Sequence, residues 1–399
     1  MAAPALELAD IFRLHGEDYR SAQQLPVEQH RAMRAIEQCR TAALGGHLEE
    51  CSQCQHRRFV YQSCRNRHCP KCQSLARAQW LEARKEELLP VEYFHVVFTL
   101  PEQIAAIALH NKAAVYNLLF QAAAETLTTI AGDDKHLGAR IGFFAILHTW
   151  GQTLMHHPHL HCVVAGGGLS VDDTHWVSCR PGFFLSVRVL SRLFRRLFLH
   201  KLEKAHRKGR LQFFSTLQPL RDPSRFRRYL APLRRTEWVV YSKPPFGGPA
   251  TVLEYLGRYT HRVAISNQRL LSLQQDQIRF RYKDYRHAQR PKTMTLHAGE
   301  FIRRFLLHVL PPGFQRIRYY GLAGNRYRRQ RLLRCRQLLG VPQPSPAPAK
   351  PLSFRERYLA LTGRDLRACP LCHCGQMVIV ELLMRIVRSR GSPRVSDSP

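Results

Sequence analysis

The sequence predicts an α+β fold in which helices pack on an antiparallel sheet, with a small cysteine-rich module ahead of the sheet. Two observations lead to this prediction. From residue 92 to residue 242, the segments follow the order strand, helix, strand, strand, helix, strand, which is typical of a ferredoxin-like layout. The first 80 residues hold six of the twelve cysteines, which indicates a separate module.

The individual elements follow from hydrophobic periodicity and from helix-ending residues. Residues 76–89 (ARAQWLEARKEELL) have an amphipathic pattern and predict a helix that ends at Pro90. Residues 92–100 (EYFHVVFTL) are β-rich and predict a strand. The other expected elements are a helix at 101–131, strands at 141–150 and 160–165 that connect through Pro158, with the glycines 166–168 ending the second, a basic helix at 185–208, a strand at 237–242, a helix at 250–259 and a strand at 277–282.

The chain is strongly basic. Its 399 residues include 61 Lys and Arg against 29 Asp and Glu, which gives a formal net charge of +32. This excess implies a polyanionic partner, because each neutralised phosphate releases condensed counterions. A ribosomal or membrane-surface protein would share the charge, but 4 Trp, 14 Tyr and 20 Phe indicate a packed globular body. The segments expected to contact phosphates are 189–210, 221–235 and 302–336.

The N-terminus lacks the basic and apolar stretches of a signal peptide, and no run of about 18 apolar residues exists to span a membrane. We therefore expect a cytoplasmic, nucleoid-associated protein with no membrane partner. Cysteines in a reducing compartment favour metal binding over disulfides. The expected divisions are a zinc-binding module at 1–89, a main domain at 90–340, a Pro-rich linker at 341–351, and a short cysteine-containing segment with a disordered tail at 352–399.

Paired cysteines carry the prediction of zinc. Cys51-x2-Cys54 and Cys69-x2-Cys72 have 14 residues between the inner cysteines, and each pair can chelate from one tight turn. Chance placement of twelve cysteines would give about 0.4 CxxC pairs, whereas this chain has three. We therefore expect Cys51, Cys54, Cys69 and Cys72 to hold a structural zinc ion.

Two further groups are open to interpretation as metal sites. The first is either a second zinc site or a buried thiol with ordinary surface side chains, and its members are Cys39, His47, Cys64 and His68. The second is the C-terminal motif CPLCHCG, which is half a site with no further CxxC after it. It either borrows a distant ligand, binds metal across a dimer, or is idle, and its cysteines are Cys369, Cys372 and Cys374.

A histidine pair, His159-Leu160-His161, stands at the start of a predicted strand. Alternate residues on a strand face the same way, about 7 Å apart, so these two imidazoles can grip one metal ion. The spacing alone is weak, because core or surface histidines are commoner. The preceding strand offers Gln152 as a third ligand and His148 as the reserve. Such a set suits magnesium or manganese moderately, with phosphate oxygens completing the shell.

Tyr255 and Tyr259 are four residues apart and would share one face of a helix. The plain alternative is that both rings pack against the sheet. Arg258, His261 and Arg262 interleave with them, which suits a site that handles phosphate charge. A tyrosine that attacks a phosphodiester keeps the bond energy in a phosphotyrosine, so the strand can be rejoined elsewhere.

Together these motifs resemble the two-tyrosine HUH transposases of the insertion-sequence-91 family, which move by a rolling-circle route. The resemblance covers most of residues 30–325. It is carried by CRTAALGGH with the Cys51-x2-Cys54 pair, SCRNRHCPKC, HTWGQTLMHHPHLHCVVAGGG and YLGRYTHRVAISN, and FIRRFLLHVLPPGF also looks like the family. The joint match is far more specific than any one motif.

The resemblance implies an HUH-type sheet and a DNA-cleaving activity. His159 and His161 would be the paired metal ligands, and Tyr255 and Tyr259 the nucleophiles. Cleavage would act on single-stranded DNA, with subterminal hairpins as recognition features and the zinc-binding domain helping to recognise the element's ends. The sequence has no GxxxxGK[ST] phosphate loop, so a host helicase is expected to unwind the DNA.

Three other functions fit parts of the sequence. A rolling-circle replication initiator or conjugative relaxase would use the same chemistry but prime copying at one origin. A non-catalytic zinc-dependent nucleic-acid-binding protein would use the histidines and tyrosines only structurally. An inactive relic of an element would retain both tyrosines and both histidines without activity.

Overall fold

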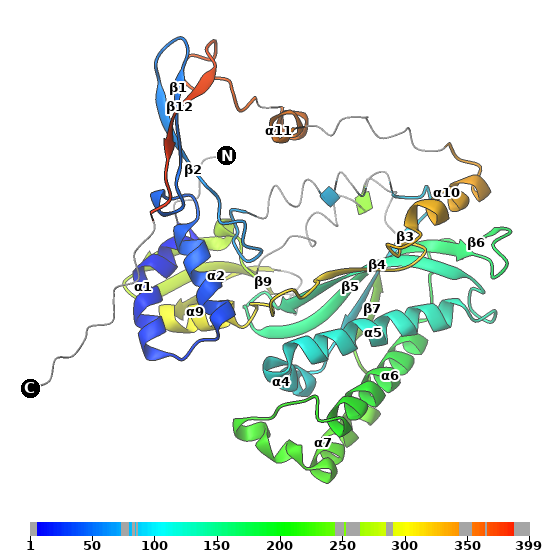
Figure 1. Ribbon diagram of the computed structural model, residues 1–399. Coiled ribbons are helices and arrows are strands. Elements are labelled where there is room, and N and C mark those ends of the chain that lie inside the picture. The colour runs from blue at the N-terminus through cyan, green and yellow to red at the C-terminus, as the bar shows by residue number, and fades with distance from the viewer. Residues whose placement is uncertain are drawn as a thin grey trace, which may run out of the picture. The chain divides into compact units, whose positions relative to one another are not determined.

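The computed structural model (Figure 1) describes residues 6–72, 80–81, 84, 87–243, 251–252, 264–284, 290–342, 353–363 and 365–386. The chain divides into two compact units. We call residues 1–6 with 74–346 the sheet unit, and residues 7–73 with 347–399 the cysteine unit. Among the described residues, no helix is long and apolar enough to cross a membrane.

An antiparallel sheet forms the centre of the sheet unit, with its strands in the order β11-β4-β5-β3-β7 and with β6 paired to β5. The four strands β4-β5-β3-β7 come from the predicted strand and helix sequence, and their spatial order is ferredoxin-like (Figure 1). The predicted fold class is therefore confirmed. The strands are β3 Tyr93–Thr99, β4 Arg140–Trp150, β5 His156–Leu169, β6 Trp176–Ser178, β7 Val240–Lys243 and β11 Ile317–Gly321.

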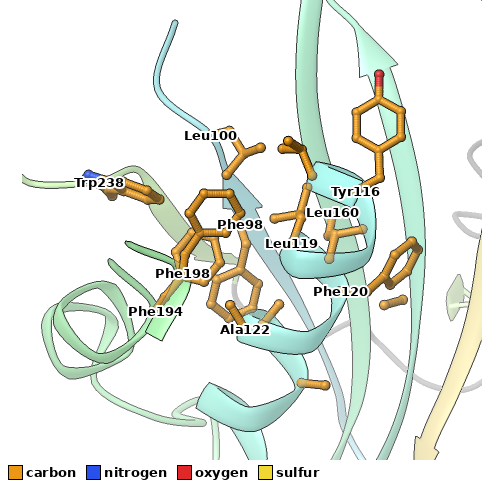
Figure 2. Packing of buried hydrophobic residues seen from close by; sticks show 14 of the residues in the cluster. Phe98, Leu100, Tyr116, Leu119, Phe120, Ala122, Leu160, Phe194, Phe198 and Trp238 are labelled. Carbon is orange, nitrogen blue, oxygen red and sulfur yellow. The ribbon is translucent and has the colours of Figure 1, made fainter. Parts of the chain in front are cut away.

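Helices cover one face of this sheet and bury the main hydrophobic core (Figure 2). The ring centroid of Phe98 lies 4.9 Å from that of Phe194, which lies 5.5 Å from that of Trp238. Alternate residues of each strand supply this core, because successive side chains point to opposite faces of a sheet. The helices are α4 Glu102–His110, α5 Lys112–Ala131, α6 Val187–Arg207 and α7 Pro223–Arg235, with the short η2 Ser215–Arg221 before α7.

The helix predicted at 101–131 is in fact two helices, α4 and α5, which meet at Asn111. The buried side-chain amide of Asn111 donates to the carbonyl oxygens of Ile107 and Gln212, at 3.0 and 2.7 Å. Its side-chain oxygen accepts the backbone N–H of Gln212 at 2.7 Å. A side chain that satisfies backbone groups in this way competes with a continuous helix. Asn111 thereby anchors the segment that follows α6.

Strand β5 extends beyond its predicted limits at both ends. It includes Pro158, which was expected in the connection, and it runs through the glycines to Leu169. A Cβ on Gly168 would lie 2.4 Å from the carbonyl oxygen of Arg140, and β6 crowds Gly167 in the same way. The glycines therefore permit close approach of backbone on both sides of β5 rather than ending the strand.

The opposite face of the sheet carries a smaller apolar cluster that includes Ile146 and Val163. Val252 is fully buried in this cluster, so the chain after β7 returns to this face. His148 of β4 and His159 and His161 of β5 share this face, because they alternate with the core residues Leu147 and Leu160.

A second antiparallel sheet in the sheet unit has the order β10-β9-β8. The strand predicted at 277–282 is confirmed as part of β9, and Phe280 packs edge-on against Phe301 of α9. The strand predicted at 92–100 is confirmed as β3 and the basic helix at 185–208 as α6. The helices predicted at 76–89 and 250–259 lie largely outside the described residues. The new elements are η3 Asn267–Arg269, β8 Leu270–Gln274, β9 Gln277–Asp284, β10 Arg290–His297, α9 Ala298–Leu306 and α10 Arg328–Leu338.

The cysteine unit contains a three-stranded antiparallel sheet in which β1 lies between β12 and β2 (Figure 1). The C-terminal strand pairs with β1 from Gly46↔Leu383 to Cys51↔Met377. Segments from both ends of the sequence thus form one sheet. The elements are α1 Leu8–Ala22, α2 Val27–Gln38, η1 Ala42–Leu44, β1 Gly46–Cys51, β2 Arg57–Tyr61, α11 Phe354–Thr362 and β12 Met377–Leu383.

Candidate functional site

Three histidines gather on the face of the main sheet opposite the helices. Strands β4 and β5 place His148 directly across from His159, and His161 follows two residues later on the same face. One ring nitrogen from each of the three histidines lies within 4.8 Å of the others. His148 and His161 are buried and His159 is half-buried. The strand pairing therefore presents three imidazoles to one point, as a metal ion requires.

Contacts with neighbouring groups fix the orientation of two of these imidazole rings. The Nδ1 of His159 donates to the carbonyl oxygen of His157 at 2.7 Å, which leaves Nε2 as the accepting nitrogen. The Nδ1 of His161 lies 2.8 Å from the Nε2 of His95, and the two rings are nearly parallel. Burial, together with the nearby His157, lowers the pKa of His159 to about 4, so this imidazole is neutral near pH 7. A neutral, oriented imidazole is the form that binds metal.

His95 is a site residue that sequence reasoning missed. It is buried on β3, where it alternates with the core residues Phe94 and Val96. Its signal was a single histidine in an otherwise apolar strand, EYFHVVFTL, which by itself more often marks an ordinary core residue. The strand order β4-β5-β3 places it beside His161.

Gln152, the preferred third ligand, follows the end of β4, so strand alternation does not place it on the histidine face. Strand β4 ends at Trp150, and the Gly151 N–H donates to the carbonyl of Met155 in the turn before β5. The alternation of side chains between the two faces of the sheet therefore stops at Trp150, two residues before Gln152. The Oε1 of Gln152 accepts the backbone N–H of Lys283 at 3.4 Å. The histidine held in reserve, His148, is the residue that joins the pair.

The predicted nucleophiles and their basic neighbours lie outside the described residues. Val252 and Ile265, on either side of that segment in the sequence, are both buried. Val252 belongs to the apolar cluster with Ile146, which pairs directly with His161. The residues concerned are Tyr255, Arg258, Tyr259, His261 and Arg262.

A second buried polar group braces the turn between β4 and β5. The Nε2 of His156 lies 2.8 Å from the hydroxyl oxygen of buried Tyr116. The Nε2 of His308 donates to the carbonyl of Leu154 at 3.0 Å, and its Nδ1 lies 3.1 Å from the Thr149 hydroxyl. Burial, together with the nearby His308, lowers the pKa of His156 to about 3. The HTW and FLLHVL motifs of the sequence thus meet at this turn.

The cysteine unit brings its cysteines together in two groups of four, each with sulfur atoms within 4.8 Å of one another. In one group, the Sγ of Cys72 lies 3.5 Å from that of Cys39 and 3.6 Å from that of Cys64. Tetrahedral Zn–S bonds of about 2.3 Å would place sulfurs about 3.8 Å apart, so this group fits zinc. The groups are Cys39, Cys64, Cys69 and Cys72, and Cys51, Cys54, Cys369 and Cys372.

This grouping differs from the one that the sequence favoured, in which Cys51, Cys54, Cys69 and Cys72 share one ion. Cys51 ends β1 and Cys54 lies in the turn before β2, whereas Cys64 and Cys69 follow β2. In the sequence, β2 lies between the Cys51-Cys54 pair and the Cys69-Cys72 pair, and each pair meets cysteines from another segment instead.

The expected second site is also differently composed. Its cysteines, Cys39 and Cys64, meet other cysteines and no histidine. The Nε2 of His47 lies 3.1 Å from the Oε1 of Glu49, with which it forms an ion pair when protonated. Within the described part of the chain, neither His47 nor His68 belongs to a group of potential metal ligands. Thiolate-only sites of this kind are typical of structural zinc.

A hollow of about 640 Å³ lies beside α6 and carries basic side chains. Arg234 pairs with Glu203, and Arg195 donates to the Thr236 carbonyl, so both guanidinium groups are held in place. The hollow has a charge suited to phosphate. Its arginines are Arg192, Arg195, Arg196 and Arg234.

Comparisons with known proteins identify the class of protein. Residues 142–331 match a family model described as "Putative transposase", and residues 11–100 match one described as "Transposase zinc-binding domain". The α+β fold, the four-cysteine groups and these two matches define a transposase that carries a zinc-binding domain.

The chain belongs to the insertion-sequence-91 family of transposases, which confirms the resemblance noted in the sequence. It is 64% identical over 400 residues to "Putative transposase y4qJ" of Sinorhizobium fredii, and the match covers all of both chains. It is 30% identical over 342 residues to "Transposase for insertion sequence element IS801" of Pseudomonas savastanoi pv. phaseolicola. That match covers 84% of this chain and 79% of the relative. No solved structure matches the chain.

Proposed function

We propose that this transposase cleaves and rejoins single-stranded DNA through a 5′-phosphotyrosine intermediate, in rolling-circle transposition. The observation that carries the proposal is the convergence of His148, His159 and His161 on one point of the main sheet. Val252 is buried on the same face and precedes Tyr255 by three residues in the sequence. The proposed nucleophile therefore follows a residue anchored on the histidine face.

The three histidines would hold a divalent metal ion, magnesium or manganese. Imidazole ligands suit manganese better, because magnesium prefers an octahedral shell of oxygen atoms. When bound, such an ion polarises the scissile phosphate. His95 fixes the ring of His161, and the His157 carbonyl fixes that of His159, so the ligand nitrogens keep their directions.

In the proposed reaction, the phenol oxygen of Tyr255 or Tyr259 attacks the scissile phosphorus and loses its proton. A phosphorus–oxygen bond to tyrosine forms while the bond to the 3′ oxygen of the neighbouring nucleotide breaks. That oxygen takes up a proton and leaves as a 3′-OH. A 3′-OH from a target strand reverses the exchange and releases the tyrosine. Arg258, His261 and Arg262 would contact the phosphate charge.

The proposed substrate is single-stranded DNA with hairpins near the ends of the element. The arginines of α6 and α7 that line the hollow would hold the phosphate backbone, and the zinc-binding module would assist in recognising the ends. We assign DNA unwinding to a host helicase, and we place the reaction in the cytoplasm at the nucleoid.

The proposal is tested by incubating the purified chain with labelled single-stranded DNA that carries its element's end, with magnesium or manganese. Products are separated on a denaturing gel. We expect a metal-dependent protein–DNA adduct that protease removes and that persists in the control Tyr241→Phe, an exposed tyrosine of β7. The adduct should disappear in the double variant Tyr255→Phe/Tyr259→Phe and fall strongly in His159→Ala.

Two results would overturn the proposal. One is an adduct that survives the double tyrosine substitution, which would assign the nucleophile to another residue. The other is the absence of any adduct while salt-sensitive DNA binding is retained, which would identify a DNA-binding protein without this chemistry.

A further inference from the structure

We propose that Cys51, Cys54, Cys369 and Cys372 bind a second zinc ion, which ties the C-terminal segment to the N-terminal module. The Sγ atoms of Cys51 and Cys372 are 3.6 Å apart, as are those of Cys54 and Cys369. These separations are close to the edge of a tetrahedral zinc–thiolate site, about 3.8 Å. They are far longer than a disulfide bond of about 2.05 Å. The inference is independent of the tyrosine chemistry.

The backbone around the sulfurs has the form that thiolate ligands need. The N–H of Gln53 points to the Sγ of Cys51 at 3.4 Å, and the N–H of Leu371 points to that of Cys369 at the same distance. Each CxxC turn therefore directs the N–H two residues after its first cysteine at that sulfur. Such bonds stabilise negative charge on sulfur and orient it toward a metal. The first cysteine group uses the same device, in which the Asn66 N–H points to Cys64.

Gly375 is required by the close approach of the two cysteine turns. A Cβ at this position would lie 2.3 Å from the Sγ of Cys51. The N–H of Gly375 also points to the Sγ of Cys372 at 3.4 Å, and its carbonyl accepts the N–H of Cys369. One glycine therefore contacts three of the four sulfur-bearing residues. A larger residue would push the C-terminal half of the site away from the N-terminal half.

The polypeptide brings the two halves together without help from sulfur. Ser52 and Gln376 exchange two hydrogen bonds, one between backbone atoms at 2.9 Å and one to the Ser52 hydroxyl at 3.1 Å. Arg58 donates to the carbonyl of Leu366 at 3.0 Å. Strand β12 then pairs with β1 along its length. The site is thus preorganised by the sheet, which lowers the entropy cost of assembling four ligands around one ion.

The burial of two of the four cysteines also supports a metal ion at this site. Cys51 is 2% exposed and Cys369 is fully buried, in a small cluster with Met377. This cluster is too small to stabilise a sheet by apolar burial alone, and small modules commonly obtain the missing stability from a structural metal. The ion would also close a loop of about 315 residues between Cys54 and Cys369. The ion would therefore join two segments that lie far apart in the sequence.

The test counts thiolate-bound metal in the full-length protein. Zinc is exchanged for cobalt, whose sulfur-to-metal charge-transfer absorption reports thiolate ligands and ignores metal bound only by histidine. We expect two thiolate-bound ions per chain in the unmodified protein and one in Cys372→Ser, with about half the charge-transfer absorption. Gly375→Ala should lose the same ion, because its methyl group would displace Cys51.

Four companion variants define the outcome. Cys374→Ser changes an exposed cysteine outside both groups and should keep two ions. Cys372→His replaces one zinc ligand with another and should retain the second ion, which separates ligand loss from misfolding. Cys64→Ser should lose only the ion of the other group. Tyr255→Phe/Tyr259→Phe should keep both ions whether or not the proposed tyrosine chemistry is correct.

The proposal is overturned if the unmodified chain holds one thiolate-bound ion, or if Cys372→Ser still holds two. Equal loss in Cys374→Ser and Cys372→Ser would also overturn it. If thiol titration finds Cys51, Cys54, Cys369 and Cys372 oxidised in the freshly purified protein, the group is a pair of disulfides and not a zinc site.

Discussion

His161 reaches the proposed metal site with its Nδ1 already 2.8 Å from the Nε2 of His95. A contact of this kind selects one tautomer and fixes the ring direction, so the other nitrogen is presented to the ion. His95 would thus act as a positioning residue, because it contacts a ligand and not the reacting phosphate.

Replacing His95 tests this role. His95→Phe should weaken manganese binding about 10- to 100-fold, as is usual when the partner of a metal-bound histidine is removed. His95→Asn keeps a hydrogen-bonding group and should restore part of the affinity. Manganese titration followed by calorimetry measures both, with His200→Phe on the exposed side of α6 as the control. Unchanged affinity in His95→Phe would show that the contact is only structural.

His156 gives the protein a predictable response to acid. Burial and His308 lower its pKa to about 3, whereas an unfolded histidine titrates near 6.5. Between these values the unfolded chain binds a proton that the folded chain does not, so the free energy of unfolding rises with pH. Stability from this group should be complete above about pH 6.5 and should decline as the pH falls toward 3.

Chemical denaturation at a series of pH values checks this dependence. His156→Gln should be less stable near neutrality and should show a shallower loss of stability between pH 6.5 and pH 4. The exposed substitution His136→Gln should leave the profile unchanged. A profile of equal steepness in His156→Gln would mean that other groups dominate acid unfolding.

At the scale of elements, the ends of strands and helices decide what their side chains can reach. Strand β4 ends at Trp150, so strand alternation no longer assigns Gln152 to the histidine face. Strand β5 continues through its glycines, because residues without a Cβ allow the neighbouring strands to approach closely there. The break between α4 and α5 depends on the three hydrogen bonds of Asn111.

The Asn111 junction should be important for stability. Asn111→Ala removes all three bonds and leaves the N–H of Gln212 without its side-chain acceptor. A loss of about 2–4 kcal/mol in the free energy of unfolding is expected, since each buried group left unsatisfied costs about 1–3 kcal/mol. Urea denaturation measures this loss, and Gln121→Ala on the exposed side of α5 should change stability by less than about 0.5 kcal/mol. Equal effects of the two substitutions would contradict the anchoring role.

At the scale of the whole molecule, charge and chain connection are the dominant features. The chain has a formal net charge of +32. Its strand β12, near the C-terminal end of the sequence, pairs with β1 near the N-terminal end. The arginines of α6 and α7 that line the hollow lie in the sheet unit, and both cysteine groups lie in the cysteine unit. The proposed phosphate contacts and the cysteine groups therefore lie in different parts of the chain.

Binding to single-stranded DNA should weaken steeply with salt. The logarithm of the association constant should fall linearly with the logarithm of salt concentration, with a slope of about −0.7 for each phosphate contact. Arg192→Gln/Arg196→Gln should reduce that slope by about 1.4 if each side chain neutralises one phosphate. Fluorescence anisotropy across a salt series measures the slope, with Arg140→Gln, an exposed arginine outside the three basic segments, as the control. An unchanged slope in the double variant would exclude the hollow as a phosphate contact.

Much of the fold and part of the site could be predicted from sequence. Period-two and period-3.6 patterns are local, so they predicted β3, the core of β5 and α6. The order of segments then restricted the sheet to a ferredoxin-like arrangement. Local spacing likewise brought His159 and His161 to one face, and family resemblance gave the class of protein. The tyrosine assignments stay predictions, because those residues lie outside the described ones.

The sequence by itself determined which side chains are available: paired thiols that suit zinc, paired imidazoles that suit a metal ion, and a large positive charge that suits a polyanionic partner. Only the tertiary structure decided which groups meet. It joined Cys51 and Cys54 to Cys369 and Cys372, brought His148 to the histidine pair, and placed His95 next to His161. The physical reason is that spacing within a turn or strand fixes geometry over a few residues, whereas partners between distant segments depend on strand pairing and on where each element ends.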